Sequence, residues 1–86
     1  MRLRWSQQAQ DDLERLPKAI ARRIATKMEW YVAQNEPWAF AKPLSAHPRA
    51  IMRFRVGDYR VLCDLENGAL TIVVVVAVRH RKNAYM

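Results

Sequence analysis

The second half of the chain is dominated by three runs of strand-forming residues separated by two tight-turn signals. Residues 53–85 read RFRVGDYRVLCDLENGALTIVVVVAVRHRKNAY. Gly57-Asp58 and Asn67-Gly68 each lie between runs rich in β-branched and aromatic residues. Such dipeptides are typical of two-residue hairpin loops, because Gly and Asn tolerate positive φ. The stretch therefore predicts three antiparallel strands connected by two hairpins.

The first predicted hairpin determines which side chains share a face of the sheet. Side chains alternate between the two faces of a strand, and residues directly opposite on neighbouring strands share one face. A loop at Gly57-Asp58 pairs Val56 with Tyr59, Arg55 with Arg60, Phe54 with Val61, Arg53 with Leu62 and Met52 with Cys63. The core face then holds Met52, Phe54, Val56, Tyr59, Val61 and Cys63, and the opposite face holds Arg53, Arg55 and Arg60.

The second predicted hairpin extends both faces to the third strand. Leu70 to Val78 is almost continuously apolar, which is typical of a central strand covered on both sides. We therefore expect the arginine face to be apolar at its centre, with the cations around a concavity. A loop at Asn67-Gly68 places Ile72, Val74 and Val76 on the core face, and Thr71, Val73, Val75, Ala77 and Arg79 on the arginine face.

Several guanidinium groups on one sheet face oppose stability, because like charges on neighbouring strands repel by some tenths of a kcal/mol. Local choices that oppose stability are expected mainly at functional sites, and Arg binds phosphate through two parallel hydrogen bonds. We therefore interpret the face of Arg53, Arg55, Arg60 and Arg79 as an anion-binding site. The alternative is a solvated basic surface, and a register slip of one residue would scatter the four side chains.

The first half of the chain predicts a short strand and two helices. Met1 to Trp5 alternates apolar and basic residues, and Ser6 is placed to cap a following helix. Pro17 begins a second helix that extends to Gln34 with one apolar stripe, and Asn35 to Pro48 is an irregular connector. We expect a single α+β domain over residues 1–86, with an N-terminal strand, two helices and a three-stranded antiparallel meander. The helices should pack on one face of a small twisted sheet.

The acidic residues near the N-terminus and the single cysteine could suggest a catalytic or metal site, but both have a simpler structural interpretation. Asp11, Asp12 and Glu14 lie on the first predicted helix without a histidine or third ligand nearby, so we interpret them as a solvated helix face rather than a metal or acid-base site. Cys63 is the only cysteine, which excludes an intrachain disulfide and a cysteine-based zinc site. We expect Cys63 to be a small buried hydrophobic residue.

The net charge of +7 indicates an acidic partner, which can be nucleic acid, an acidic protein or a membrane surface. Basic residues exceed acidic ones in both halves of the chain, so the basic surface is built into the fold rather than confined to a tail. The N-terminus has no apolar secretory signal, and the apolar run from Leu70 to Val78 is about half as long as a membrane helix. We expect a cytoplasmic protein that does not enter a membrane.

The motif RFRVGDYRV, the apolar strand and the tail VRHRKNAY together resemble the RelE/ParE superfamily of bacterial toxin-antitoxin toxins. The resemblance covers nearly the whole chain, including Lys42-Pro43-Leu44, and the tail ending in tyrosine is more similar to the RelE branch. It implies a RelE-like fold and a toxin that cleaves messenger RNA in the ribosomal A site, by attack of a ribose 2′-hydroxyl on the adjacent phosphate without a metal or other cofactor. It also implies an antitoxin partner, which the net charge predicts to be acidic.

The resemblance also implies roles for single residues. Arg60 and Arg79 match arginines that stabilise charge on the phosphate and leaving group. Arg53 matches a lysine implicated in activating the nucleophile, and Tyr85 matches a terminal tyrosine that orients the substrate. The catalytic set is therefore Arg53, Arg60, Arg79 and Tyr85, and the RNA-binding set is Arg55, His80, Arg81 and Lys82.

This chain departs from the RelE pattern in the residues available for proton transfer. Ile51 and Arg53 stand where the RelE type has two lysines, and arginine stays protonated near neutrality, so it is a poor general base. Acid-base chemistry would then rest on Tyr85, on His80 or on ribosomal groups. Strand alternation points His80 away from the arginine face.

Two other functions remain open at this point. The main alternative is a ParE-like inhibitor that binds DNA gyrase and has no chemistry of its own. The other is a toxin that has lost its activity and only binds its antitoxin.

Overall fold

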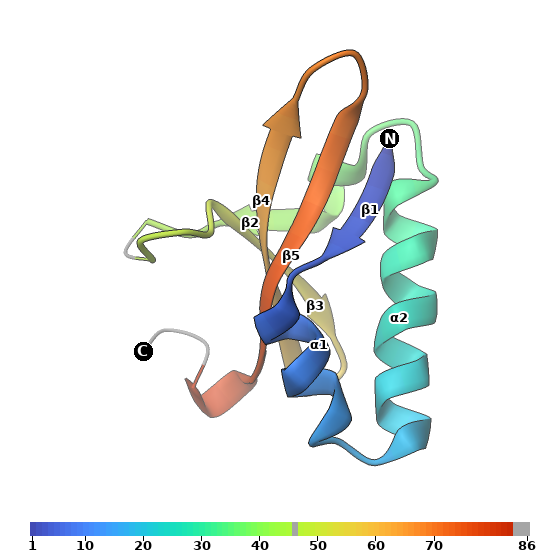
Figure 1. Ribbon diagram of the computed structural model, residues 1–86, viewed down its shortest axis with the longest axis vertical. Helices are drawn as coiled ribbons and strands as arrows, with labels where there is room; N and C mark the ends of the chain where they lie inside the picture. The colour runs from blue at the N-terminus through green and yellow to red at the C-terminus, as the bar shows by residue number, and fades with distance from the viewer. Residues whose placement is uncertain (46, 84–86) are drawn as a thin grey trace.

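The computed structural model describes residues 1–45 and 47–83, which form a five-stranded mixed sheet with two helices (Figure 1). The strand order is β1-β5-β4-β3-β2, with β1 parallel to β5 and the other neighbours antiparallel. This arrangement confirms the predicted α+β class and element order. The elements are β1 Arg2–Trp5, α1 Gln7–Glu14, α2 Lys18–Val32, η1 Pro37–Phe40, β2 Ala41–Pro43, β3 Met52–Val56, β4 Tyr59–Asn67, β5 Thr71–His80 and η2 Arg81–Asn83, where η marks a 3-10 turn.

The two helices begin where the sequence predicts. The Ser6 hydroxyl accepts the backbone N–H of Ala9 at 3.1 Å and caps α1, and Pro17 directly precedes α2. Ile24, Met28 and Tyr31 form the buried stripe of α2, which covers one face of the sheet (Figure 1). No helix among the described residues is both long and apolar enough to span a membrane.

The first hairpin has the predicted two-residue loop. Gly57 has a φ of 58°, a left-handed conformation that glycine adopts without a Cβ clash. All five predicted pairs of β3 with β4 are present, from Val56 opposite Tyr59 to Met52 opposite Cys63. The predicted core residues of these two strands pack with α2 in the main hydrophobic cluster.

The second hairpin differs from the prediction in two ways. Asn67 lies opposite Thr71, so the loop holds three residues, 68–70, rather than two. A bulge then shifts the register, because Cys63 faces Val75 whereas Leu62 faces Ala77. The assignment of Ile72, Val74 and Val76 to the core face was therefore wrong, as was that of Thr71, Val73 and Val75 to the arginine face. Val73 and Val75 pack in the main cluster instead.

The bulge restores the predicted alternation at the end of β5. Beyond it, Val78 lies opposite Val61 in the core, and Arg79 lies opposite Arg60 on the other face. The prediction that Ala77 and Arg79 share the arginine face is thus confirmed. The extra loop residue and the bulge each invert the alternation once, so their effects cancel.

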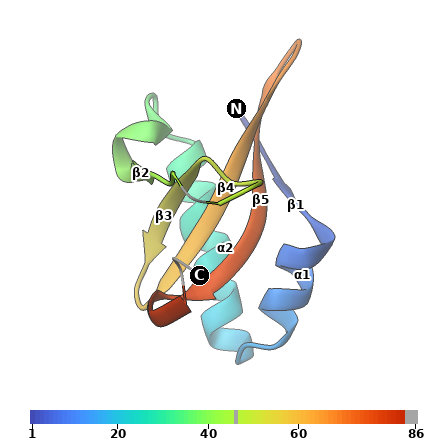
Figure 2. The same cartoon turned by 90° about the vertical axis from the view of Figure 1, so that its left-hand side faces the viewer.

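The connector between α2 and β3 is more regular than expected. It contains the short η1 turn and the strand β2, whose residues lie antiparallel to β3 at the edge of the sheet. Pro43 ends β2, as proline can at an edge strand where its missing N–H breaks no ladder. The segment that follows β2 crosses in front of β4 in Figure 2, on the face opposite α2. We call this the open face.

Candidate functional site

Three arginines form a row across adjacent strands on the open face. Arg55 of β3 lies opposite Arg60 of β4, which in turn lies opposite Arg79 of β5. Residues directly opposite on neighbouring strands place their Cβ atoms about 4.5–5.5 Å apart on the same face. We call Arg55, Arg60 and Arg79 the arginine row. Arg53 lies on the same face, two residues further along β3.

An apolar floor adjoins the arginine row. Leu62 and Ala77 follow Arg60 and Arg79 on this face and are almost fully buried, with 1% and 2% of their surface exposed. They are covered by Leu44 and Ala50, from the segment between β2 and β3. The open face therefore has the predicted apolar centre with cations beside it.

Backbone carbonyls hold two of the guanidinium groups. The Nη1 atom of Arg53 donates to the carbonyl of Pro43 at 3.0 Å. The Nη1 atom of Arg60 donates to the carbonyls of Gly57 and Tyr59, at 3.1 and 3.0 Å. Because the acceptors of Arg60 are neutral carbonyls, they orient its guanidinium group without cancelling its charge.

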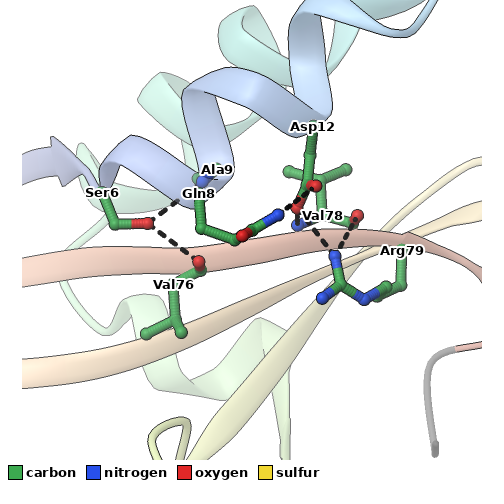
Figure 3. A network of polar contacts seen from close by, with 7 residues as sticks. All are labelled: Ser6, Gln8, Ala9, Asp12, Val76, Val78 and Arg79. Carbon is green, nitrogen blue, oxygen red and sulfur yellow. Dashed lines mark hydrogen bonds and ion pairs between the residues drawn. The ribbon is translucent and has the colours of Figure 1, made fainter.

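Arg79 is held differently, by a carboxylate. Its Nη1 atom donates to Oδ2 of Asp12 at 2.8 Å and to the carbonyl of Val78 at 3.2 Å (Figure 3). The prediction that Asp12 lies on a solvated helix face was wrong, since this residue is only 8% exposed. α1 lies along the edge of β5 beyond the end of β1, which turns Asp12 toward the sheet. Asp11, by contrast, is partly exposed, and its carboxylate accepts a hydrogen bond from its helix neighbour Gln7.

The basic tail leaves the open face at its first residue. His80 lies opposite Tyr59, and the two rings meet edge to face with centroids 5.5 Å apart. Since Tyr59 packs against the main cluster, His80 points away from the arginine row, as the alternation predicted. Arg81 and Lys82 are exposed on η2, where Arg81 pairs loosely with Asp58 at 3.9 Å. Tyr85, the fourth predicted catalytic residue, lies outside the described residues.

The open face carries further cations that sequence reasoning did not assign to the site. Arg2 and Arg4 of β1 lie opposite Ile72 and Val74, and Lys42 of β2 lies opposite Arg53. Their alternation in Met1 to Trp5 was visible, but the pairing of β1 with β5 was not. The counter-charges on this face are Asp64 and Glu66 of β4, of which Glu66 pairs with Arg4. A pocket of about 460 Å³ lies on this face, lined by Arg4, Asp64 and Glu66 together with residues 47–51 of the segment before β3.

Two other kinds of site can be assessed from the described residues, a metal centre and a nucleophilic thiol. No three His, Cys, Asp or Glu side chains within residues 1–45 and 47–83 group closely enough to hold a metal ion. Cys63 is fully buried, and burial raises the pKa of its thiol, so this thiol is not a nucleophile at neutral pH. This confirms its predicted role as a small core residue.

Known proteins share this sequence pattern and this fold. A family profile described as ParE toxin of type II toxin-antitoxin system, parDE, matches residues 3–85. The structure is similar to the toxin-antitoxin complex RelBE2 from Mycobacterium tuberculosis, with 29% identity, a TM-score of 0.73, and coverage of 93% of this chain and 96% of that chain. For the RelB-RelE antitoxin-toxin complex from Methanococcus jannaschii, the identity is 26%, the TM-score 0.62 and the coverage 95% and 94%.

The archaeal RelE-RelB complex from Pyrococcus horikoshii OT3 shares the fold, with 24% identity, a TM-score of 0.66 and coverage of 96% and 97%. No curated protein sequence matches the chain. The match to the family profile extends over nearly all of the chain, and the resemblance noted in the hairpin and tail motifs is thereby confirmed. The chain belongs to the ParE toxin family of type II toxin-antitoxin systems, and it is a toxin with a RelE/ParE-like fold.

Proposed function

We propose that this toxin is a metal-independent endoribonuclease that cleaves messenger RNA on the ribosome and so inhibits translation. The observation that carries the proposal is the arginine row, with Arg53 beside it on the same face. A row of guanidinium groups costs stability, and backbone carbonyls orient two members of this basic cluster. Such an arrangement suits an oligoanion whose phosphates follow one another along a strand.

The proposed reaction is an intramolecular transfer of the phosphate. The 2′-oxygen of a ribose forms a bond to the adjacent phosphorus while the bond from phosphorus to the 5′-oxygen of the next nucleotide breaks. Negative charge grows on the non-bridging oxygens and on the leaving oxygen. Arg60 and Arg79 would stabilise that charge by donating hydrogen bonds to it, a contribution of the kind that preorganised donors make in other enzymes. Arg53 would contact the same phosphate.

Two proton transfers accompany this exchange, and the arginine row is unsuited to both. The 2′-hydroxyl loses a proton and the 5′-oxygen gains one, whereas arginine stays protonated at neutral pH. We assign these steps to Tyr85 and to ribosomal groups, which would make cleavage dependent on the ribosome. Since His80 packs against Tyr59 on the other face, it is not our candidate for either transfer.

RNA on either side of the cleaved bond would contact the exposed cations around the row. Arg55 is exposed at the β3 end of the row, and Arg81 and Lys82 are exposed on η2 after Arg79. These three would bind flanking phosphates as point charges or through paired hydrogen bonds. His80, if it contacts RNA, would do so from the opposite face.

The test is a map of cellular mRNA ends by primer extension after brief induction of the toxin. We expect cuts in reading frame within translated regions. Arg60→Ala should reduce them by a factor of about 10²–10³, the effect of losing one donor to a developing charge. Arg22→Ala, an exposed arginine on α2, is the matched control and should cleave normally. Growth arrest without mRNA cuts, or arrest that Arg60→Ala and Tyr85→Phe both leave intact, would refute the nuclease.

One observation favours a second candidate, a toxin that inhibits DNA gyrase by binding it. The family profile that matches this chain has the description ParE toxin of type II toxin-antitoxin system, parDE. In this case the basic open face would dock on gyrase and perform no reaction. Arrest accompanied by DNA damage, with mRNA intact, would support this function.

We further propose that the antitoxin of this toxin is acidic where it covers the open face. The structural relatives are described as complexes of toxins with their antitoxins. On the open face of this chain, the cations of β1, β2, β3, β4 and β5 outnumber the carboxylates Asp64 and Glu66. Purification from the native host should yield a complex with an acidic protein, and a complex whose partner is basic would contradict this.

A further inference from the structure

Asp12 is a buried carboxylate with three donors around it. Its Oδ2 atom accepts the backbone N–H of Val78 at 2.9 Å and Nη1 of Arg79 at 2.8 Å, and its Oδ1 atom accepts Nε2 of Gln8 at 2.8 Å (Figure 3). Removing an ionised carboxylate from water is costly unless hydrogen bonds and an opposite charge compensate. All three donors together supply that compensation here.

The edge of β5 does not itself require a charged residue at this position. At Val76, two residues before Val78 along β5, the strand edge is met by a neutral group, because the Ser6 hydroxyl donates to the carbonyl of Val76 at 2.8 Å (Figure 3). A neutral amide oxygen at position 12 could likewise accept the N–H of Val78. The negative charge of Asp12 is thus explained by Arg79 rather than by the strand edge.

The contact determines how Arg79 presents its remaining donors. The guanidinium group is a rigid planar fork, and two acceptors at Nη1, on Asp12 and on Val78, restrict its rotation. The other two nitrogens of the group point away from α1 (Figure 3), and within residues 1–45 and 47–83 no partner is recorded for them. Those nitrogens carry the donors that a phosphate in the arginine row would meet.

We propose that Asp12 is a positioning residue for Arg79, holding the guanidinium so that its outer edge is preorganised for the scissile phosphate. The inference rests on the nuclease function proposed above. Asp12 would not touch the RNA. Because Asp12 already restricts the Arg79 side chain, the conformational entropy of ordering that long side chain would not have to be lost during the reaction. This is what preorganisation means physically.

The chain offers a closely matched pair of variants for the test. Asp12→Asn keeps an oxygen for Val78 but loses the charge that holds Arg79. Asp11→Asn makes the same change one residue earlier, where the carboxylate accepts only from Gln7 at 2.9 Å among the described residues. We expect Asp12→Asn to lower kcat about tenfold with little change in KM, as losses at orienting residues commonly do, and Asp11→Asn to leave both unchanged.

Combining Asp12→Asn with Arg79→Ala separates positioning from a merely structural role. If Asp12 acts through Arg79, the double variant should cleave no more slowly than Arg79→Ala alone. A structural role would instead lower cleavage by the same factor in both backgrounds, in step with a loss of folded protein. That outcome would overturn the inference.

A second measurement needs no activity, and its refuting outcome is read on the unsubstituted toxin alone. In nitrogen-15 NMR spectra of the full chain, the Arg79 side chain should show slow rotation of its guanidinium group in the unsubstituted toxin, and fast rotation in Asp12→Asn. Freely rotating Arg79 in the unsubstituted toxin would refute positioning. If the toxin cleaves RNA and Asp12→Asn cleaves equally well, Asp12 positioning fails while the nuclease stands. If the unsubstituted toxin cleaves no RNA, the proposed nuclease function is refuted, and so is the catalytic role of Asp12 that rests on it.

Discussion

The two faces of the sheet show opposite solutions to the same strand geometry. On the helix face, β3 contributes Phe54, which is fully buried against Tyr31 and Trp38. One residue along, Arg55 is exposed on the open face, opposite Arg60. Alternation thus assigns stability to one set of side chains and charge to the other, and single residues can be changed on one face with little direct effect on the other.

The difference shows that the stability needed to hold the arginines on the open face comes from the packed core on the helix face. Cations directly opposite each other destabilise a sheet by tenths of a kcal/mol per pair, whereas a fully buried aromatic side chain contributes several kcal/mol. The fold therefore tolerates the arginine row because the core behind it provides much more stability than the row removes. Substitutions on the two faces should separate folding from function.

The largest effect should come from Phe54→Ala. The substitution removes the ring of a residue that is 0% exposed, whose centroid lies 4.9 Å from that of the Tyr31 ring, and so leaves a cavity under the sheet. We expect the free energy of unfolding in urea to fall by about 3–5 kcal/mol. Arg55→Ala, one residue away on the open face, should change it by less than about 0.5 kcal/mol or raise it slightly, because a repulsive pair is removed.

The comparison of faces would fail if these two variants lost similar stability. A large loss in Arg55→Ala would mean that the open face contributes to the core through the stem of its arginine. The Tyr31 hydroxyl donates to the backbone carbonyl of Arg55 at 2.7 Å, and neither substitution removes either of these two groups.

The burial of Cys63 on the helix face also predicts that the free energy of unfolding depends on pH. Burial raises the pKa of the Cys63 thiol, so the folded state keeps a proton that the unfolded chain releases above about pH 8.5. Stability should consequently fall as the pH rises from that point, by up to about 1.4 kcal/mol per pH unit. Urea unfolding under reducing conditions between pH 7.5 and 9.5 measures this slope. Cys63→Ala should show a shallower slope, and equal slopes in both proteins would contradict the sealed core.

The parts of the fold that local sequence controls were predictable. The Gly57-Asp58 loop fixes five residue pairs, because a two-residue loop leaves one register and glycine adopts the φ of 58° without a Cβ clash. Ser6 and Pro17 likewise mark the beginnings of the two helices. In each case, the signal and its consequence are within a few residues of each other.

The second hairpin was predicted incorrectly because its signals are ambiguous. Asn67-Gly68 resembles a two-residue turn, yet Gly68 begins a three-residue loop. From Ile72 to Val76 every residue is apolar, so the sequence has no alternation that could reveal the loop length or the bulge at Leu62 and Cys63. Arg79 reached the predicted face because two inversions cancelled.

The parts of the site that depend on distant contacts could not be predicted at all. Asp12 and Arg79 are 67 residues apart in the sequence, and their contact requires α1 to lie along the edge of β5. Arg2 and Arg4 join the open face only through the parallel pairing of β1 with β5, which no local motif indicates. The roles of Arg53, Arg60, Arg79 and Tyr85 remain predictions for the experiments proposed above.

The smallest expected effect is on the salt dependence of RNA binding, when a charge on the open face is removed rather than a charge elsewhere. A protein that neutralises phosphates of single-stranded RNA loses affinity with salt, with a logarithmic slope of about 0.7 for each phosphate contacted. Arg55→Ala should therefore reduce the slope by about 0.7 for a 2′-O-methyl oligoribonucleotide, which cannot be cleaved. Arg22→Ala removes the same charge from the exposed side of α2 and should leave the slope unchanged.

This pair of variants asks whether position or net charge governs RNA binding. Both lower the net charge from +7 to +6 at neutral pH, because each removes a single guanidinium. If binding followed net charge alone, the two salt slopes would fall equally, and the open face would have no special relation to RNA. A fall confined to Arg55→Ala would locate the phosphate contacts on the open face, because the screening length near physiological salt, about 8 Å, is too short for a charge beyond the core to act on them.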